Sequence, residues 1–312
     1  MTNSVSAPAK IILFGEHAVV YGQPAIAVPV TDLRVFATFQ PNDPPGQGLR
    51  VTAEDLDIQL PGDLPERVDD ALSLTTKLVL QRIGATHAPD VTVAIDSQIP
   101  IASGMGSGAA FAAAFARALA ASLNRTLDDD ALNTLVYEIE KIHHGTPSGI
   151  DNTVIVYERP IYFVREQPIE PIDVGAPLHL LIGDTGQKAS TREAVGDVRK
   201  LFDSDSSRIQ PLLDEIGALV RSARDAIAAG DSQTVGALMS QNHTLLQVLT
   251  VSSPELDRLV GAATEAGALG AKLSGGGRGG NMIALVAPET QQQVGAALRA
   301  AGAVRVFPTT IR

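Results

Sequence analysis

Two carboxylates flank a turn near the middle of the chain. Glu140 stands near the end of a predicted helix, and Asp151 follows eleven residues later, beyond the Pro-Ser-Gly turn at 147–149. A turn at this place lets the chain double back, so the two acids can converge on one site. One carboxylate can then hold a divalent cation while the other orients or deprotonates a hydroxyl group. The pair is therefore a candidate for metal and acid–base chemistry.

A glycine-rich stretch, GMGSGA at 104–109, leads into an alanine-rich predicted helix at 107–123. The first amides of a helix lack helical partners and the helix dipole adds positive charge, so such a start can bind phosphate. Taken alone, the stretch fits equally well a phosphate loop and a helix start without a ligand. It is not a GxxxxGK[ST] loop, and it matches GxGxxA without the acid-terminated strand that dinucleotide binding requires.

Two further stretches combine polar side chains with permissive backbone. Lys10, Glu16 and His17 surround a short apolar strand, and five glycines occupy 275–280 between two predicted strands. Five glycines weaken regular structure, and they make sense where backbone must approach a ligand or another loop closely. Charged groups beside a strongly apolar strand are uncommon, which draws attention to the first group, but that group also fits a lysine at a strand start followed by a solvated Glu–His turn.

Composition narrows the class of function. The chain has 312 residues and a net charge of −11. An acidic surface argues against nucleic-acid and anionic-membrane partners, because both need a positive face. The chain contains no cysteine, which excludes thiolate catalysis, disulfides and cysteine-based zinc sites. It has no signal-peptide pattern and no apolar run of about 18 residues, so we expect a cytoplasmic protein without a membrane partner.

Hydrophobic periodicity predicts mixed helices and strands, and hence an α+β (or α/β) fold with two domains. The proline-containing segment 165–177 marks the expected boundary, giving domains at 1–168 and 169–312. Strands are predicted at 10–14, 24–30, 33–40, 49–54, 91–96, as a pair over 153–164, and from 178, 271, 282 and 304 onward. Helices are predicted at 71–83, 107–123, 129–143, 190–203, 207–229, 233–249, 254–267 and 289–301.

Taken together and in this order, these stretches resemble the GHMP family of small-molecule kinases. The resemblance rests on PAKIILFGEHAVVYG (8–22), PIASGMGSGAA (100–110), HGTPSGIDN (144–152) and KLSGGGRGGNMIAL (272–285), with weaker support from IGDTGQKASTREAV (182–195). The glycine loops mark the whole family, whereas the first and third stretches are most similar to its mevalonate-phosphorylating branch. The matches span nearly the whole chain.

The resemblance implies a fold and a reaction. The fold would pair an N-terminal domain like the second domain of ribosomal protein S5 with a ferredoxin-like C-terminal domain. The enzyme would use ATP and Mg²⁺ to phosphorylate the 5-hydroxyl of mevalonate in isoprenoid precursor synthesis, and a homodimer would be possible. Two alternatives remain open at this point: a kinase of the same fold for another small alcohol, and an ATP-dependent decarboxylase of the mevalonate route.

The resemblance also implies residue roles, carried over motif by motif. Asp151 would act on the hydroxyl with Lys10 beside it, and Glu140 would hold Mg²⁺ together with Ser107. The remaining residues would bind substrate (Glu16, His17, Ser148 and Thr191), bind the ATP phosphates (Ser103, Gly104, Met105, Gly106, Ser107, Gly108 and Ala109), or form a supporting glycine loop (Gly275, Gly276 and Gly277).

Two positions depart from the family pattern. Gly108 stands where the family has a serine that binds Mg²⁺, so the metal would lack one protein oxygen unless water or Ser107 replaces it. Arg278 stands where the family usually has glycine. Its guanidinium group would clamp a phosphate or point to solvent, and we favour solvent. A further alternative is a binding protein without catalytic activity. Gly108 is the only residue that favours it, and the presence of Lys10, Glu140 and Asp151 argues against it.

Overall fold

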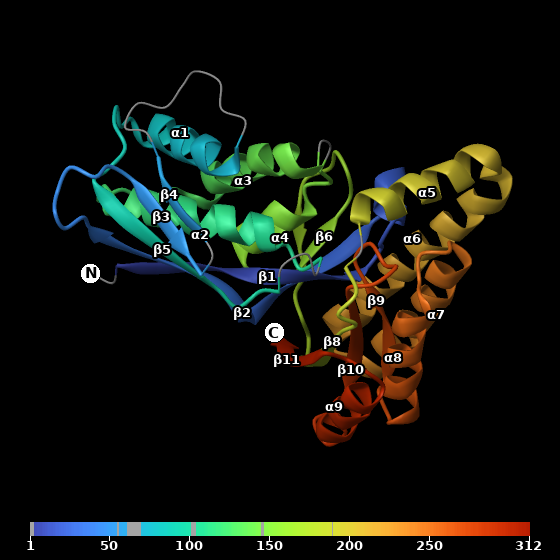
Figure 1. Ribbon diagram of the computed structural model, residues 1–312. Coiled ribbons are helices and arrows are strands. Elements are labelled where there is room, and N and C mark those ends of the chain that lie inside the picture. The colour runs from blue at the N-terminus through green and yellow to red at the C-terminus, as the bar shows by residue number, and fades with distance from the viewer. Residues whose placement is uncertain (1–2, 55, 61–69, 101–103, 145–146, 189) are drawn as a thin grey trace. The chain divides into compact units, whose positions relative to one another are not determined.

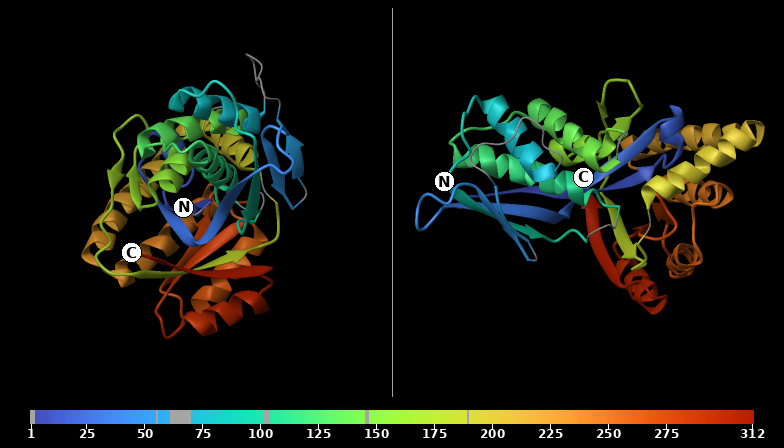
Figure 2. Two further views of the ribbon diagram at one scale, coloured as in Figure 1. Left: turned by 90° about the vertical axis from the view of Figure 1, so that its left-hand side faces the viewer. Right: turned by 45° about the horizontal axis from the view of Figure 1, so that its top comes forward.

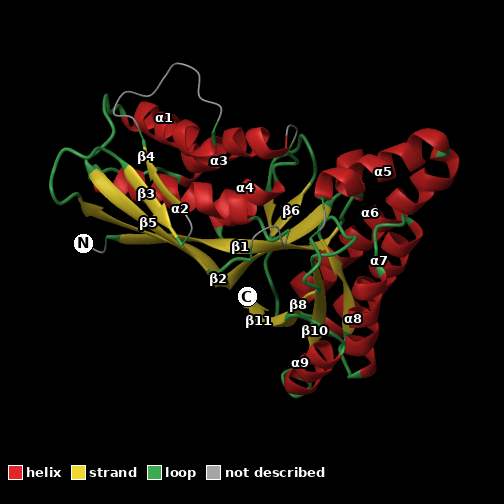
Figure 3. Ribbon diagram, viewed as in Figure 1, coloured by secondary structure: helices red, strands yellow, loops and turns green. Residues whose placement is uncertain are grey.

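The structure is a computed structural model that describes residues 3–54, 56–60, 70–100, 104–144, 147–188 and 190–312. Its residues group into two compact units. The first unit comprises 1–9, 33–100 and 106–158, and the second comprises 10–32, 101–105 and 159–312. Each unit contains both helices and strands (Figure 3). The domain boundary expected at residue 168 stays a prediction.

The first unit is a sheet covered on one face by helices (Figure 1 and Figure 2). Its strands run in the order β4-β3-β5-β2, with β1 paired to β2. The β3–β5 pair is parallel, whereas β3–β4 and β2–β5 are antiparallel. The strands are β1 (Ser4–Phe14), β2 (Ala25–Pro41), β3 (Arg50–Ala53), β4 (Leu56–Gln59) and β5 (Val91–Ser97). Strands β1 and β2 contribute residues to both units.

The first unit contains four helices among its described residues, and the first of them begins and ends at capping residues. They are α1 (Ala71–Ile83), α2 (Ser107–Ser122), α3 (Asp129–His144) and α4 (Ile150–Tyr157). The Asp70 side chain accepts a hydrogen bond from the Ser73 amide at the start of α1, and Gly84 ends that helix in the left-handed conformation. Helix α2 is rich in alanine, the strongest helix former, and its alanine face and Phe115 are fully buried.

The second unit contains an antiparallel sheet in the order β11-β8-β10-β9. These strands are β8 (Leu178–Asp184), β9 (Gly270–Ser274), β10 (Asn281–Val286) and β11 (Arg305–Ile311). With helices between β8 and β9 and between β10 and β11, this is the β-α-β-β-α-β order of a ferredoxin-like sheet. Short strands β6 (Ile161–Phe163) and β7 (Glu170–Pro171) extend the other sheet from the first residues of β2.

The second unit also contains six helices among its described residues. They are η1 (Ala18–Tyr21), α5 (Thr191–Ser204), α6 (Ser206–Ala229), α7 (Ser232–Val248), α8 (Pro254–Glu265) and α9 (Gln291–Ala300). Ser190 caps α5 by accepting a hydrogen bond from the Glu193 amide. Helices α7, α8 and α9 pack against the strands and bury their apolar faces there. In the part of the chain that the structure describes, no helix is long and apolar enough to cross a membrane.

The strand pair expected over 153–164 is wrong. Residues Ile150–Tyr157 form helix α4, and only Ile161–Phe163 form a strand. The β-branched run TVIV favours a strand locally, but a short apolar run buried on all sides does not distinguish strand from helix. Here packing against α2 and α3 decides in favour of the helix. The two strands expected at 24–30 and 33–40 are one continuous strand, β2.

The contact between α7 and β9 yields a prediction about stability. A Cβ atom added at Gly270 would lie 1.8 Å from the Gly236 carbonyl oxygen, so the backbones must separate in Gly270→Ala. We expect a loss of about 1–3 kcal/mol in the free energy of unfolding, the usual range for overpacking. Gly261→Ala on α8 is the control, because nothing lies within 4 Å of its added Cβ. The control should gain about 0.5–1 kcal/mol of helix propensity in urea titrations. Equal stabilities of the two variants would contradict the prediction.

Candidate active site

The predicted phosphate loop forms a glycine-lined turn into α2. Gly104 and Gly106 have left-handed backbone, with φ of 75° and 72°, and Gly106 is the residue before the helix begins at Ser107. Between these glycines, Met105 is buried, and its carbonyl oxygen accepts a 3.0 Å hydrogen bond from the Lys10 amide. Ser103 lies outside the described residues. The start of α2, with Ser107, Gly108 and Ala109 in its first turn, therefore has the backbone geometry that an anion site needs.

The two predicted acids stand on neighbouring helices of the first unit. Glu140 is a buried residue of α3, with 3% of its surface exposed, and Asp151 is the second residue of α4. Asn152, next to Asp151, donates a 2.6 Å hydrogen bond from Nδ2 to Asn133 Oδ1 on α3. This side-chain bond helps to set the register of the two helices. The exposed Ser148 lies just before α4, and its Oγ accepts a hydrogen bond from the Ile150 amide.

A buried ion pair lies in the second unit and was not anticipated from the sequence. Lys272 on β9 donates a hydrogen bond from Nζ to Oε1 of Glu16, and the two side chains are 0% and 1% exposed. Lys272 Nζ also donates to the Leu273 carbonyl oxygen at 2.7 Å. Burial raises the pKa of Glu16 and lowers that of Lys272, while the attraction between the two charges opposes both shifts. The other oxygen of Glu16, Oε2, has no hydrogen-bond partner among the described residues.

His17 follows Glu16 and has a defined tautomer. Its Nε2 lies 3.0 Å from the carbonyl oxygen of Gly276, and a carbonyl only accepts, so Nε2 carries the hydrogen. Nδ1 is then an acceptor, buried and without a partner in the part of the chain that the structure describes. Burial lowers the pKa of His17 to about 4, with the Gly276 hydrogen bond acting in the opposite direction. A neutral imidazole in this state is suited to accept a hydrogen bond from a hydroxyl group.

The second glycine run packs tightly against its neighbours. A Cβ at Gly276 would lie 2.9 Å from Thr191 Oγ1, and one at Gly277 would lie 1.9 Å from the Val251 carbonyl oxygen. Gly275 and Gly277 also have left-handed backbone. Gly276 therefore allows the loop to lie directly against α5, whose first residue is Thr191, and Gly277 allows it to lie against Val251.

Arg278 belongs to this loop, and its side chain is exposed to solvent, the orientation that the sequence analysis favours. Its Nη1 donates a hydrogen bond to Oδ2 of Asp197 on α5, and its Nε donates to the Thr250 carbonyl oxygen at 3.4 Å. The backbone of Arg278 is left-handed, and its amide donates to the Val251 carbonyl oxygen. Arg278 thus connects the glycine loop to α5.

The sequence contains a signal for the residues that were missed. Lys272 is the single charged residue in the small apolar run GAKLS, which becomes a fully buried strand. A lysine in such a run needs a buried acidic partner. Ser274 in the same strand donates from Oγ to the Ile12 carbonyl oxygen at 2.9 Å, which ties β9 to β1.

The donors present suit a magnesium ion carried by a nucleotide. Mg²⁺ prefers oxygen ligands and usually takes one or two carboxylates from the protein, with phosphates and water completing its coordination. Glu140 offers a buried carboxylate and Ser107 a hydroxyl at the start of α2. No cluster of three or more acidic or histidine residues suited to a metal ion occurs among the described residues. The donor set therefore fits a cation that arrives with phosphate, and it does not fit an all-protein metal cage.

Comparison with known proteins identifies close relatives. Family models for the N-terminal and C-terminal domains of GHMP kinases match residues 71–159 and 223–304. A mevalonate kinase of Thermococcus sibiricus is 38% identical over 96% of this chain and 94% of its own length. The crystal structure of L. major mevalonate kinase in complex with R-mevalonate superposes with a TM-score of 0.85 at 31% identity, covering 100% of this chain and 96% of the other. That of Methanococcus jannaschii mevalonate kinase gives 0.86 at 28% identity, covering 100% and 99%.

The burial of His17 predicts a pH dependence of stability. Its pKa is about 4 in the folded chain and about 6.5 when unfolded, so below pH 6.5 the unfolded state takes up a proton that the folded state does not. Between pH 6.5 and 5, His17 should therefore remove about 2 kcal/mol from the free energy of unfolding. The matched variant His17→Gln cannot titrate and should lose this part of the slope.

Urea titrations of both proteins from pH 7 to 5 measure the difference in slope. Burial also lowers the pKa of His243, so some loss of stability at low pH should remain in both proteins. Identical slopes for wild type and His17→Gln would refute the role assigned to His17 burial.

Proposed function

Since the chain belongs to the GHMP kinase family, we propose that it transfers the γ-phosphoryl group of ATP to the 5-hydroxyl of mevalonate, producing 5-phosphomevalonate and ADP. The observation that carries the proposal is its similarity to mevalonate kinases over almost the entire chain, including a solved structure with R-mevalonate bound. The buried, unpartnered Glu16 Oε2 and His17 Nδ1 support it, because both are acceptors for a polyhydroxylated substrate.

Asp151, Glu140 and the start of α2 would supply the groups for the chemical step. Phosphoryl transfer requires alignment and charge neutralisation more than covalent chemistry by the protein. Asp151 would orient the 5-hydroxyl and accept its proton. The amides at the start of α2 would hold the phosphates, together with the glycines before them. Glu140 and Ser107 would hold Mg²⁺, which neutralises phosphate charge when bound.

Other predicted residues would supply substrate contacts and positive charge. Lys10 would stabilise the charge that develops on the transferred phosphoryl group. Neutral His17 would accept a hydrogen bond from the substrate, while Lys272 holds Glu16 in place. Thr191 would contribute a hydroxyl at the start of α5, and Ser148 would add another. The glycine loop at 275–277 supports His17 through the Gly276 carbonyl.

A cytoplasmic location and a homodimer complete the proposal. Both follow from the sequence expectations and the family resemblance. Light scattering of the purified protein would measure the mass of the assembly directly.

The proposed role of Asp151 leads to a prediction. Asp151→Asn keeps the size of the side chain but removes the proton acceptor, so we expect turnover with mevalonate and ATP to fall by about 10²–10⁴-fold. The matched control is Asp129→Asn, which makes the same chemical change at an exposed residue in the first turn of α3. A coupled assay for ADP measures both variants, and circular dichroism checks the fold. An Asp151→Asn rate equal to that of Asp129→Asn would exclude the role.

Gly108 leads to a second prediction, about the metal. A serine at this position restores the hydroxyl that the family uses as a Mg²⁺ ligand. Gly108→Ser should therefore lower the Mg²⁺ concentration needed for half-maximal rate. Gly108→Ala is the control for the change in helix propensity, because it adds a Cβ without a ligand oxygen. Steady-state rates over a Mg²⁺ titration at saturating ATP test the idea, and an equal shift in both variants would contradict it.

A further inference from the structure

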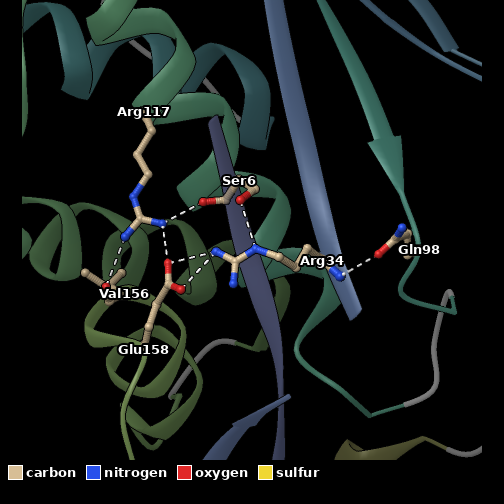
Figure 4. A network of polar contacts seen from close by, with 6 residues as sticks. All are labelled: Ser6, Arg34, Gln98, Arg117, Val156 and Glu158. Atoms are coloured by element: carbon tan, nitrogen blue, oxygen red, sulfur yellow. Dashed lines mark hydrogen bonds and ion pairs between the residues drawn. The ribbon is translucent and has the colours of Figure 1, made fainter. Parts of the chain in front are cut away.

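A network of polar contacts in the first unit gathers around the carboxylate of Glu158 (Figure 4). Arg34 on β2 donates from Nη2 to both carboxylate oxygens, at 3.0 Å and 2.9 Å. Arg117 on α2 donates from Nη1 to Oε1 at 2.9 Å. Both arginines also bind Ser6 on β1: Arg34 Nε donates to its hydroxyl at 2.8 Å, and Arg117 Nη1 to its carbonyl at 2.7 Å. Glu158 therefore links the end of α4 directly to β2 and α2, and through the two arginines to β1.

Arg117 also holds the end of α4 directly. Its Nη2 donates a 3.0 Å hydrogen bond to the carbonyl oxygen of Val156, which lies in the last turn of α4. The last carbonyls of a helix have no partner within the helix, so a guanidinium group there replaces the missing donor. The same arginine thus binds the backbone of α4 and the side chain that follows it.

The backbone at Glu158 is one that glycine usually adopts. Glu158 ends α4 in the left-handed conformation with φ of 52°. Glycine has the least steric cost at such a helix end. A glutamate at this position carries backbone strain that glycine would avoid. Its side chain, which glycine lacks, is only 30% exposed and is bound by two arginines.

The network lies away from the functional ends of both helices that it joins. Ser107 begins α2 at the proposed phosphate loop, and Arg117 follows about 15 Å further along the helix. Asp151 lies in the first turn of α4, and Glu158 follows about 10 Å further along. Because helices are stiff over such lengths, fixing α4 to α2 at the Arg117 contact determines where the first turn of α4 lies along α2.

We propose that Glu158 is a positioning residue that, through Arg117 and Arg34, sets the placement of Asp151 relative to the phosphate-binding start of α2. This inference rests on the proposed function, because it requires Asp151 and the α2 loop to act on the two reacting groups. Glu158 itself contacts neither substrate. Its effect should therefore appear in the rate of the chemical step and leave the binding of mevalonate and ATP nearly unchanged.

Glu158→Gly separates positioning from stability. Glycine relieves the left-handed strain while removing the network, so the two effects on stability oppose each other. The phosphoryl-transfer rate in a single turnover should fall about tenfold or more, since a misplacement of about 1 Å can cost on the order of 100-fold. The KM values for ATP and mevalonate should stay within about twofold. Rapid quench of wild type and variant at saturating substrates, well below the melting temperature, measures this rate.

The chain offers a matched control in Glu166→Gly. Glu166 is also left-handed, with φ of 63°, but its side chain is 86% exposed, and its ion pair among the described residues is with the neighbouring Arg165. The control makes the same chemical change and relieves the same strain without touching the network, so it should keep the wild-type rate. Equal rates for Glu158→Gly and Glu166→Gly would overturn the inference.

A double variant tests whether Glu158 acts through Arg117. If both residues belong to one positioning network, combining Arg117→Met with Glu158→Gly should lower the single-turnover rate little beyond the larger single effect. Multiplication of the two single effects would show that they act separately and would overturn the inference. A wild-type protein that does not phosphorylate mevalonate would overturn the proposed function, and the inference with it. Wild-type turnover with an unchanged Glu158→Gly rate would overturn the inference alone.

Discussion

The buried ion pair between Glu16 and Lys272 is the interaction on which the second unit depends. Removing two charges from water costs several kcal/mol per ion, and only good geometry and further hydrogen bonds offset this cost. The pair joins the turn after β1 to strand β9, two segments far apart in the sequence. Two residues further along β9, the Ser274 hydroxyl donates a hydrogen bond to the Ile12 carbonyl oxygen on β1 and so adds a second connection. The glycine run begins directly after β9. Because β9 is held in place, the Gly276 carbonyl oxygen is positioned to accept a hydrogen bond from His17 Nε2.

Helix N-termini recur at three of the proposed ligand contacts. Helix α2 begins at the phosphate loop, α4 begins one residue before Asp151, and α5 begins at Thr191. A helix start presents unpaired amides and partial positive charge, and the helix behind it is rigid. An acidic protein can thereby bind an anionic nucleotide, because the local charge comes from backbone and metal, whatever the net charge of the surface. The polar network around Glu158 and the Asn133–Asn152 contact help to position the start of α4 through contacts with α2 and α3.

The sequence predicted most elements of the fold because their periodicity and caps agree. Helix α1 was expected at its observed bounds from the helical spacing of its apolar residues. In the structure Asp70 caps its start and Gly84 its end. The fold class and the kinase family were also predicted, and the comparisons confirm both. Helix α4 was missed because its β-branched residues favour a strand, and only tertiary packing decides otherwise. The residue roles stay predictions.

Side-chain partners were the least predictable part of the site. Lys272 was visible as an odd charge in an apolar strand, but its partner lies 256 residues away in Glu16. Arg117 is likewise a lone charge in an alanine-rich helix, and no local pattern connects it with Glu158, 41 residues later. Pairing over such separations depends on which elements pack together, and that information is absent from any window of sequence.

The strand order β11-β8-β10-β9 has a consequence for the order of events during synthesis. Strand β8 lies inside the sheet, yet its neighbour β11 begins at Arg305, more than a hundred residues after β8 ends at Asp184. A growing chain therefore carries β8 with one edge open until the last strand has been made. Pairings over such long loops also form slowly, because loop closure must precede the contacts that reward it. The apolar residues of β8 are thus the segment of the nascent chain most in need of protection from other chains before synthesis is complete.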